Sequence, residues 1–502
     1  MTRAVRTTLV LLTLTMAVLG LPLLAAAQEV TIALAGEPTT LDPQKATDRL
    51  TSIITTNIYD SLTFRDKDMK IQPGLATSFK RLNDRTWQFQ LREGVKFHDG
   101  EPFDAAAVKF SIDRILNPET KSPMISYVNT IEKVEIINPM TVNITTKAPD
   151  PLLLYRVGEL HGQIMPPRYL KEKGDVEFGK LPVGTGPYKV ERFVKNDRLV
   201  LVANEAYWRG APRVKRLTLR PVTEDATRMA MILSGEADLA TNVPPVQAAS
   251  LKASGRVAIE SVTTPRLFYV VIDTSKPPFT DKRVRQALNY AIDVPTIIQK
   301  VFMGYGKRVA TYVGMQSFGY DPSVQPYPYD PERAKKLLAE AGYPNGFSVT
   351  FDSFTGSLVD PSTLSEAVTG YLEKVGIKVS LNVEEFGIFA KRRLANNNNP
   401  LSIYSFGDVW LDADLPLKYM MQGKLGHYYA NPPLKEKIDE AGRIFDEAKR
   451  RAIYSDVQKS LKEEAPKIFL LQYEAIFAVG PRVKYAPRAD EILWFYDLAM
   501  AK

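Results

Sequence analysis

The sequence predicts a mixed α/β fold of about three structural units, and three observations support this. Apolar and polar residues alternate in short segments such as 30–34 and 86–91, which is typical of half-buried strands. Asp104, Thr280 and Asp330 each stand just before a segment with apolar residues at helical spacing, as helix-capping residues do. The chain has 502 residues, which corresponds to about three domains of ordinary size.

Strands are predicted in both isolated segments and hairpins. Segment 30–34 has Val, Ile and Leu at alternate positions and forms the first strand. Segments 78–82 and 86–91 are predicted to form a hairpin, because an Asn-Asp turn separates them. Segments 134–137 and 142–144 form a second hairpin around an Asn-Pro turn.

Four helices carry clear end signals. Asp104 is predicted to cap a helix that ends before a proline, and Thr280 to cap a second helix. Asp330 caps a third, with Pro at its first position and Gly at its end. A fourth helix is predicted over 223–234, closed by a glycine, with a strand at 237–240 after it.

The charge and the scarcity of cysteine and histidine exclude several classes of protein. Because the chain has no Cys, a disulfide scaffold, a thiolate zinc site, a cysteine nucleophile and a Cys-linked lipid anchor are excluded. Its 3 His do not favour a histidine-built metal site or a histidine-dependent triad. The formal net charge of +8 is spread along the chain rather than gathered on one basic face, so nucleic-acid binding is not expected.

Residues 1–27 are predicted to be a cleaved secretory signal peptide. Arg3 and Arg6 give a charged start, an apolar run follows from Leu9 to Leu24, and three alanines at 25–27 offer a cleavage site. A membrane anchor is the alternative, but the run is short for a span and contains a proline. No other segment approaches about 18 uninterrupted apolar residues, so we expect a soluble mature chain in the periplasm.

Segments that imitate catalytic motifs are better explained as turns. Residues 184–187 are glycine-rich, but they lack the Gly-Lys-Ser/Thr sequence that cradles phosphate. His98 and Asp99 lie in a predicted turn, and adjacency alone does not make a catalytic dyad. His161 and His427 have no partners at metal-ligand spacing, and no Gly-x-Ser-x-Gly motif occurs. We therefore predict no catalytic residue, no cofactor and no metal site.

Residues 404–414 form the most informative loop, directly after a short predicted strand at 401–405. The loop combines Tyr, Phe and Trp with a glycine and three aspartates. Carboxylates beside aromatic rings can bind a cationic group. A solvated acidic loop explains the same residues equally well, and the sequence leaves both interpretations open.

Several motifs occur in a fixed order along nearly the whole chain after residue 28. They are Glu37–Pro43, Pro73–Ala76, Leu91–Gly100, Gly184–Tyr188, Tyr207–Gly210, Pro277–Phe279, Arg283–Asp293 and Tyr327–Tyr343. In this order they resemble the large periplasmic solute-binding proteins of peptide-type ABC importers, which include dipeptide-, oligopeptide- and nickel-binding proteins.

The resemblance implies a two-lobed periplasmic-binding-protein fold with a cleft and a hinge between the lobes. Lobe I is expected to combine residues 28–60, 184–272 and 473–502. A subdomain at 61–183 is expected to be inserted into lobe I, and lobe II to span 273–472. Two chain crossings would form the hinge.

The resemblance implies capture of a ligand rather than catalysis. Closure of the cleft around a peptide or peptide-like solute would present the closed form to the permease subunits of an ABC importer. We expect a periplasmic monomer that binds no nucleic acid. Binding of nickel or another metal chelate, an opine or an oligosaccharide is the alternative within the family. A secreted hydrolase is the alternative from a different class.

The resemblance also suggests which loop residues bind the ligand. Asp408 follows Phe406 and a glycine, where peptide binders of the family place the Asp that pairs with the ligand's amino terminus. The surrounding sequence departs from the family's pattern, so Asp412 or Asp414 could take this role instead. Trp410 is expected to narrow the pocket.

Four further residues are expected to line the cleft. Arg266 and Tyr269 lie at the predicted crossing strand 267–272, where Arg266 could meet a ligand carboxylate. Thr39 and Thr40 follow the first strand and are expected at the cleft edge of lobe I.

Overall fold

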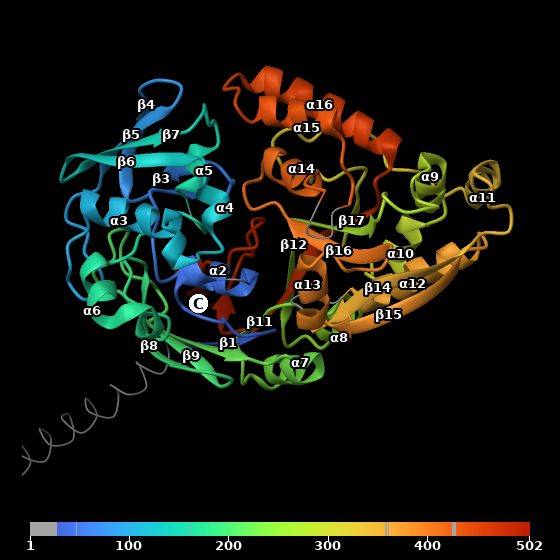
Figure 1. Cartoon of the computed structure of the whole chain (residues 1–502). Coiled ribbons are helices and arrows are strands. Elements are labelled where there is room, and N and C mark those ends of the chain that lie inside the picture. The colour runs from blue at the N-terminus through green and yellow to red at the C-terminus, as the bar shows by residue number, and fades with distance from the viewer. Residues whose placement is uncertain are drawn as a thin grey trace, which may run out of the picture.

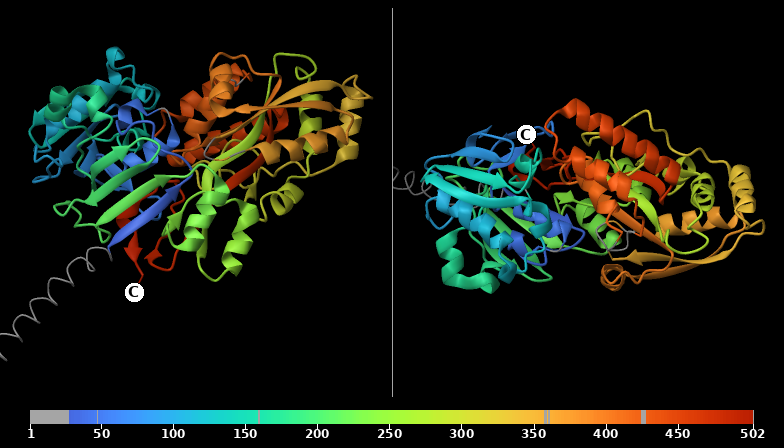
Figure 2. Two further views of the ribbon diagram at one scale, coloured as in Figure 1. Left: turned by 90° about the horizontal axis from the view of Figure 1, so that it is seen from below. Right: turned by 45° about the horizontal axis from the view of Figure 1, so that its top comes forward.

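The computed structural model describes residues 28–46, 48–158, 160–356, 359, 361–423 and 428–501. The predicted signal peptide at 1–27 and His427 lie outside the described residues. Two halves of the molecule lie side by side, and long strands cross between them (Figure 1 and Figure 2). We call the half that contains the first strand lobe I and the half drawn in yellow and orange lobe II.

One sheet runs through both lobes. In spatial order its described strands are β15 (Lys378–Glu385), β14 (Ser348–Thr355), β16 (Leu401–Gly407), β12 (Ala258–Ile272), β17 (Lys467–Val479), β11 (Leu239–Ala240), β1 (Glu29–Leu34), β10 (Arg216–Pro221), β9 (Arg198–Ala203) and β8 (Tyr188–Val194), and β13 (Lys307–Arg308) pairs with β17 beside this path. Strand β1 lies parallel to both β10 and β11, whereas β12 is antiparallel to both β16 and β17. The strand predicted at 30–34 is therefore confirmed as β1.

The crossing between the lobes is made by β12 and β17, which pair along most of their length. Thr263 pairs with Glu474 and Leu267 with Gln472, so three residues of β12 stand opposite Tyr473 alone. A bulge of this kind bends and twists a strand pair. The register shift therefore places the bend of the crossing at residues 264–266. The residue ranges given above for lobe I, the inserted subdomain and lobe II remain predictions.

A separate small sheet forms the core of the region inserted between β1 and β8. Its elements are β4 (Ala76–Arg81), β5 (Thr86–Leu91), β7 (Thr141–Thr146) and β6 (Ile131–Asn138) in spatial order, the pair β2 (Thr63–Arg65) and β3 (Ile71–Pro73), the helices α3 (Ala105–Leu116), α4 (Ile125–Val128), α5 (Leu153–Arg156) and α6 (Pro167–Phe178), and the 3-10 turn η2 (Pro118–Thr120). Both predicted hairpins are confirmed by β4–β5 and β6–β7. Asp104 caps α3 as predicted, accepting from the N–H groups of Ala106 and Ala107.

The remaining helices cover the faces of the main sheet. In lobe I they are α2 (Arg49–Thr55), α7 (Asp225–Ser234) and α8 (Pro245–Ala253), with η1 (Pro43–Lys45), η3 (Phe495–Asp497) and the pair β18 (Val483–Lys484) and β19 (Ala499–Met500). In lobe II they are α9 (Lys282–Tyr290), α10 (Val294–Lys300), α11 (Pro331–Glu340), α12 (Ser362–Glu373), α13 (Phe386–Leu394), α14 (Asp414–Met420), α15 (Pro432–Ala441) and α16 (Glu447–Glu464). Within the described part of the chain, no helix is both long and apolar enough to span a bilayer.

Two of the predicted helix starts need correction. Asp281 rather than Thr280 caps α9, because its carboxylate accepts the N–H of Arg283 at 2.8 Å. Glu224 caps α7, so the helix begins at Asp225 rather than at 223. Asp330 caps α11 as predicted. The strand predicted at 237–240 is shorter than expected and consists of β11 alone.

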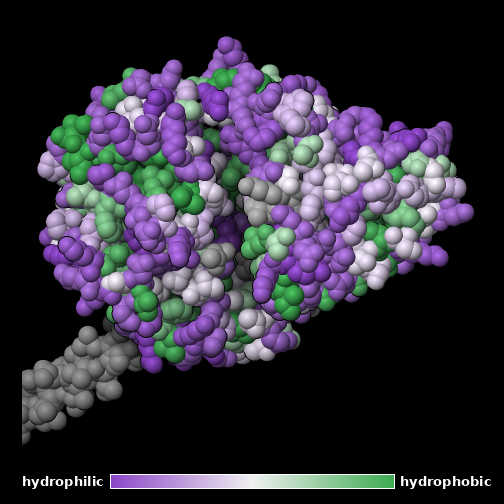
Figure 3. Space-filling view, viewed as in Figure 1, coloured by the Kyte–Doolittle hydropathy of each residue, from purple (hydrophilic) through white to green (hydrophobic). Residues whose placement is uncertain are grey.

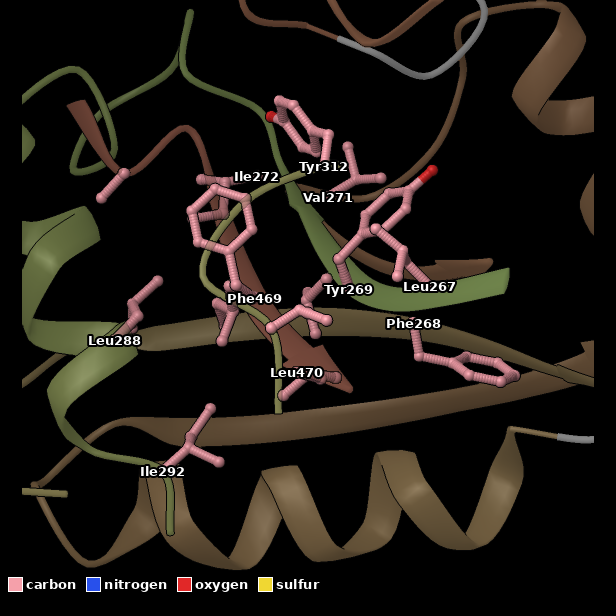
Figure 4. Close-up of a cluster of buried hydrophobic side chains, with 14 of the residues drawn as sticks. Leu267, Phe268, Tyr269, Val271, Ile272, Leu288, Ile292, Tyr312, Phe469 and Leu470 are labelled. Atoms are coloured by element: carbon pink, nitrogen blue, oxygen red, sulfur yellow. The ribbon is translucent and has the colours of Figure 1, made fainter. Parts of the chain in front are cut away.

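Each part of the molecule has its own hydrophobic core. Lobe II is built around the lobe II halves of β12 and β17, where Tyr269, Ile272 and Leu470 belong to the same cluster of buried side chains as Leu288 of α9 (Figure 4). The sheet of lobe I and the small inserted sheet form two further clusters of buried side chains. Because close-packed cores resist deformation, the lobes can move as bodies while the crossing strands bend.

Residues of the Gly-Thr-Gly-Pro and Tyr-Trp motifs converge on Asp60, just before the inserted region. Its carboxylate accepts hydrogen bonds from Thr185 Oγ1 at 2.9 Å, Tyr207 OH at 2.8 Å and Trp208 Nε1 at 3.0 Å. His98 contacts the Gly186 carbonyl, and burial lowers its pKa to about 4. These contacts confirm that the two motifs and the His98 turn are structural.

Glycine is required at 184 because the backbone of Ile58 lies against it. A Cβ at Gly184 would stand 2.1 Å from the carbonyl oxygen of Ile58. Gly370, inside α12, has open space around the same position.

Gly184→Ala is expected to destabilise the protein by about 1–3 kcal/mol, because the added methyl group overlaps backbone that cannot easily move. Gly370→Ala adds the same methyl group in a helix and should leave stability unchanged or raise it by about 0.5–1 kcal/mol. Thermal denaturation of both variants measures the difference. Equal melting temperatures would contradict the steric explanation.

Candidate ligand-binding cleft

The surface is hollowed between the two lobes (Figure 3). A groove of about 380 Å³ runs there, between α7 and α8 of lobe I and the segment around α10 and α12 of lobe II. Tyr473 of the crossing strand β17 lines this groove, and its pKa is raised by burial and by Glu491, while Arg266 lowers it. The groove therefore lies next to the bend at residues 264–266.

Two guanidinium groups share one carboxylate beside the bend. Arg266 donates from Nε and Nη2 to the two oxygens of Glu491, both at 2.8 Å. Arg49, the first residue of α2, reaches the same carboxylate with its Nε at 3.4 Å. Burial alone raises the pKa of Glu491, but Arg266 and Arg49 outweigh it and hold the pKa below its ordinary value. We call Arg49, Arg266 and Glu491 the hinge triad.

Gly407, at the end of β16, lets the backbone of lobe II lie against this triad. A Cβ at that position would stand 3.2 Å from Glu491 Oε2 and 3.4 Å from Arg266 Nη2. The absence of a side chain therefore brings the loop that follows β16 into contact with the hinge.

Aromatic rings and one further arginine surround the hinge triad. In lobe II, Phe406 stacks on Tyr419 with ring centres 4.7 Å apart. Arg393 lies 4.1 Å over the ring of Tyr404 and donates to Tyr419 OH at 3.2 Å. Burial and the neighbouring Tyr419 raise the pKa of Tyr127, which belongs to the inserted region. Aromatic walls of this kind are typical of ligand clefts.

Several contacts join the inserted region directly to lobe II, so the structure is closed. Arg65 of β2 donates to the backbone carbonyls of Val409 and Trp410. Arg156 lies 4.4 Å over the ring of Trp410, and Tyr127 meets that ring edge-on at 6.0 Å. One short loop of lobe II makes all of these contacts.

A second contact between the lobes lies apart from this loop. Trp87 of β5 meets Phe445 at 6.5 Å, and Arg81 lies 3.8 Å over the same Phe445 ring.

The three aspartates of the loop are buried and have protein partners. Asp408 accepts from Ser317 Oγ at 2.6 Å and from the N–H of Trp410 at 3.1 Å. Asp412 accepts from Arg450 at 2.8 and 2.9 Å, and Asp414 lies 2.8 Å from Lys418 Nζ. The alternative of a solvated acidic loop is therefore wrong.

Burial and the crowding of these acids change how two of them titrate. Burial, with Asp412 as a further cause, raises the pKa of Asp408 to about 7. Burial also raises the pKa of Asp412 to about 6, although Arg450 acts against it.

Phe406, Trp410 and Arg266 are brought together around the loop and the hinge, as their contacts above show. Tyr269 is 2% exposed and lies in the core of lobe II, with Tyr312 and Tyr404 each 6.0 Å away. Thr39 donates to Asp48, the residue that caps α2, and the hydroxyl of Thr40 accepts the N–H of Asp42. In this structure Thr39 thus organises the start of α2, whose first residue is Arg49, whereas Thr40 holds the residue that caps η1.

Sequence reasoning missed Arg49, Tyr127, Arg65, Arg393 and Glu491. They come from segments that are distant in the chain, and each belongs to an ordinary helix, strand or tail pattern. Within the residues described, no group of three or more His, Asp or Glu side chains is arranged to hold a metal ion.

Comparisons with known proteins agree with this architecture. The model of the bacterial extracellular solute-binding proteins, family 5, matches residues 70–448. The glutathione-binding protein GsiB of Salmonella paratyphi A is 32% identical over 468 residues, which cover 90% of each chain. GsiB of Escherichia coli K12 is also 32% identical, over 466 residues and 90% of each chain.

Solved structures show the same fold. DppA of Helicobacter pylori, in complex with the peptide STSA, superposes with a TM-score of 0.85 at 25% identity, covering 94% of this chain and 98% of DppA. NikA of Brucella suis, in complex with Fe(III)-EDTA, superposes with a TM-score of 0.86 at 25% identity, covering 94% of this chain and all of NikA. The predicted two-lobed α/β fold is confirmed, and the chain belongs to the family 5 bacterial extracellular solute-binding proteins, which capture solutes for ABC importers.

Proposed function

We propose that this chain captures a short peptide or peptide-like acid in the cleft between its lobes and delivers it to an ABC permease. The hinge triad is the observation that carries the proposal. Arg49 and Arg266 face a single carboxylate, and neighbouring Asp490 is already paired with Arg488. The triad therefore keeps an excess positive charge, which a carboxylate of the solute would neutralise through charge-assisted hydrogen bonds.

Closure follows from contacts that both lobes make with the solute. The inserted region and the loop of lobe II already touch through Arg65 and Trp410. A solute that binds both lobes adds free energy only to the closed form, so it shifts the population toward closure. The permease would then recognise the closed form.

Relatives support the peptide class. The name of GsiB states that it binds glutathione, and DppA was solved with a four-residue peptide. We propose that this chain, like the family, has no enzymatic activity. We also propose that it works as a periplasmic monomer without nucleic acid, exported by the signal at 1–27.

An anionic non-peptide solute is the second candidate, and the same excess charge favours it. MoaA of A. tumefaciens R10, in complex with mannopinic acid, superposes with a TM-score of 0.82 at 26% identity, covering 95% of this chain and all of MoaA. NikA holds an anionic iron chelate. An opine or an anionic metal chelate would therefore bind at the hinge triad, whereas a neutral oligosaccharide would leave the excess positive charge of the triad without a partner.

Mass spectrometry of the solute released by denaturing the purified protein tests the proposal. We expect a peptide or another small carboxylic acid. Adding that solute back at about 1,000 times its dissociation constant should stabilise the protein by about 4 kcal/mol, because it binds only the folded state. A protein that releases no solute and is stabilised by no short peptide or opine would refute the proposal.

Arg49→Gln should weaken binding of a free-acid peptide about 10-fold, which corresponds to about 1.4 kcal/mol. Glu491 remains paired with Arg266 in this variant, so the loss reports the missing positive charge rather than a Glu491 carboxylate left without a partner. Arg213→Gln removes the same charge at an exposed position and should leave the affinity for the peptide unchanged. Isothermal calorimetry measures all three proteins, and equal affinities would show that the triad does not bind the acid.

Asp408 is our proposed partner for a ligand amino group. A carboxylate has about four acceptor positions, so an ammonium would add to the bonds from Ser317 and Trp410. Asp408→Ala should weaken a free-amine peptide at least ~10-fold and leave its N-acetylated form unchanged. An equal loss for both forms would show that Asp408 only holds the loop.

The affinity for the free-amine peptide should also fall as the pH is lowered from 8 to 6. The pKa of Asp408 is about 7, and its carboxyl must release a proton before it can pair with an ammonium. Asp408→Ala should remove this pH dependence.

A further inference from the structure

We propose that Phe445 of lobe II and Arg81 of the inserted region form a latch that favours the closed form without help from the solute. The protein then closes part of the time before it binds a solute, and Phe445 sets the affinity from outside the cleft. The latch acts on closure itself, whatever the solute is. It rests on the proposed function only because capture between two lobes requires closure.

Phe445 reaches the inserted region from the linker between α15 and α16. The guanidinium carbon of Arg81 lies 3.8 Å from the centre of the Phe445 ring, and the centre of the Trp87 ring lies 6.5 Å from it. Arg81 and Trp87 stand directly opposite each other in the β4–β5 ladder, so their side chains share one face of the hairpin. A guanidinium over an aromatic ring is attracted to it. The latch therefore favours the state in which the two regions touch.

The guanidinium of Arg81 has no competing partner. Arg85, at the other end of the same hairpin turn, is paired with Glu132 of β6. Arg81 makes no ion pair within the part of the chain that the structure describes, and its recorded side-chain contact is the Phe445 ring. Opening the cleft would therefore exchange this contact for water rather than for a carboxylate.

Both halves of the latch are held in place by their own region. On the lobe II side, the N–H of Ile444 donates to the Ala441 carbonyl, and Asp446 caps α16 by accepting the N–H of Lys449 at 3.1 Å. On the other side, the Trp87 ring lies 6.4 Å from the ring of Phe79, within the inserted region. Because neither half needs the other for its position, the latch forms with little loss of conformational freedom.

The latch lies away from the groove in which we place the solute. None of Arg81, Trp87 and Phe445 lines that groove. In Figure 1, β4, β5 and α16 lie at the upper edge of the molecule, opposite α7 and α8, which border the groove. The apparent affinity of a binding protein is its intrinsic affinity multiplied by the fraction of molecules in the competent form. A change in the latch should therefore change the affinity for every solute by the same factor.

The closed fraction of the solute-free protein tests the latch. Because the chain has no Cys, Lys133→Cys in β6 and Lys336→Cys in α11, both at exposed positions, give two unique sites for a donor and an acceptor fluorophore. After bound solute has been removed by dialysis in denaturant and refolding, single-molecule energy transfer should show an open and a closed population. Phe445→Ala should lower the ratio of closed to open molecules about 5-fold, which corresponds to about 1 kcal/mol.

Phe347→Ala is the matched control. Phe347 is also a half-buried phenylalanine of lobe II, but its ring contacts, with Phe279 at 5.7 Å and Tyr343 at 5.5 Å, stay within that lobe. This variant should keep the wild-type ratio of closed to open molecules.

Arg81→Met tests the same contact from the other side, because it removes the charge and keeps a long side chain. We expect it to lower the ratio as Phe445→Ala does. Combining the two substitutions should lower the ratio little further, since both remove one interaction.

Three results would overturn the inference. They are a solute-free wild-type protein that is entirely open, a wild-type ratio in Phe445→Ala and Arg81→Met, and an equal fall of the ratio in Phe347→Ala. All three are obtained without a solute. They are therefore separate from the mass-spectrometric test, in which failure of the proposed function would appear as the absence of any captured acid.

Discussion

The bidentate ion pair between Arg266 and Glu491 is the interaction on which the cleft depends. Arg266 lies in the bulge of β12, and Glu491 comes from the carboxy-terminal tail, so the pair fixes that tail against the crossing strands. Gly407 then brings the end of β16 against the same pair. Removing Glu491 would leave Arg266 and Arg49 buried without the carboxylate that they share, which costs more free energy than the intact ion pair contributes.

Separate cores explain how a chain with one continuous sheet can still close around a solute. The lobe II core and the lobe I core share the crossing strands but are otherwise distinct. The register shift between Thr263 and Leu267 interrupts the ladder where the lobes meet. Bending is therefore concentrated at one place, and the contacts of Arg65 and Trp410 set the closed geometry.

The three acids of the loop after β16 are buried in the protein, whereas several arginines lie around the cleft. The loop after β16 buries three aspartates against Ser317, Arg450 and Lys418. Arginines from α2, the inserted region and α13 remain around the cleft. In the function that we propose, this arrangement attracts acids and disfavours solutes with net positive charge, because a basic solute would meet like charges.

Local sequence signals predicted most elements of the fold. Strand β1, the two hairpins and the caps of α3 and α11 follow from alternation and capping, which depend on neighbouring residues. The two wrong predictions concern the first residues of helices. Asp281 and Glu224 cap α9 and α7 in place of the residues one position before them, because their carboxylates reach the free N–H groups of the first turn. The order of the motifs identified the family's fold.

The candidate site could be predicted only in part. Phe406, Asp408 and Trp410 lie in one segment, so a motif could point to them. By contrast, the hinge triad joins Arg49, Arg266 and Glu491, which are separated by more than 200 residues along the chain.

By itself, the sequence determined the α/β class, the element order and the position of the loop that combines aromatic residues with three aspartates, because these depend on short-range patterns. The tertiary structure alone decided which charges face the cleft and which are paired internally. Burial and partnership are set by residues that meet only after the chain has folded.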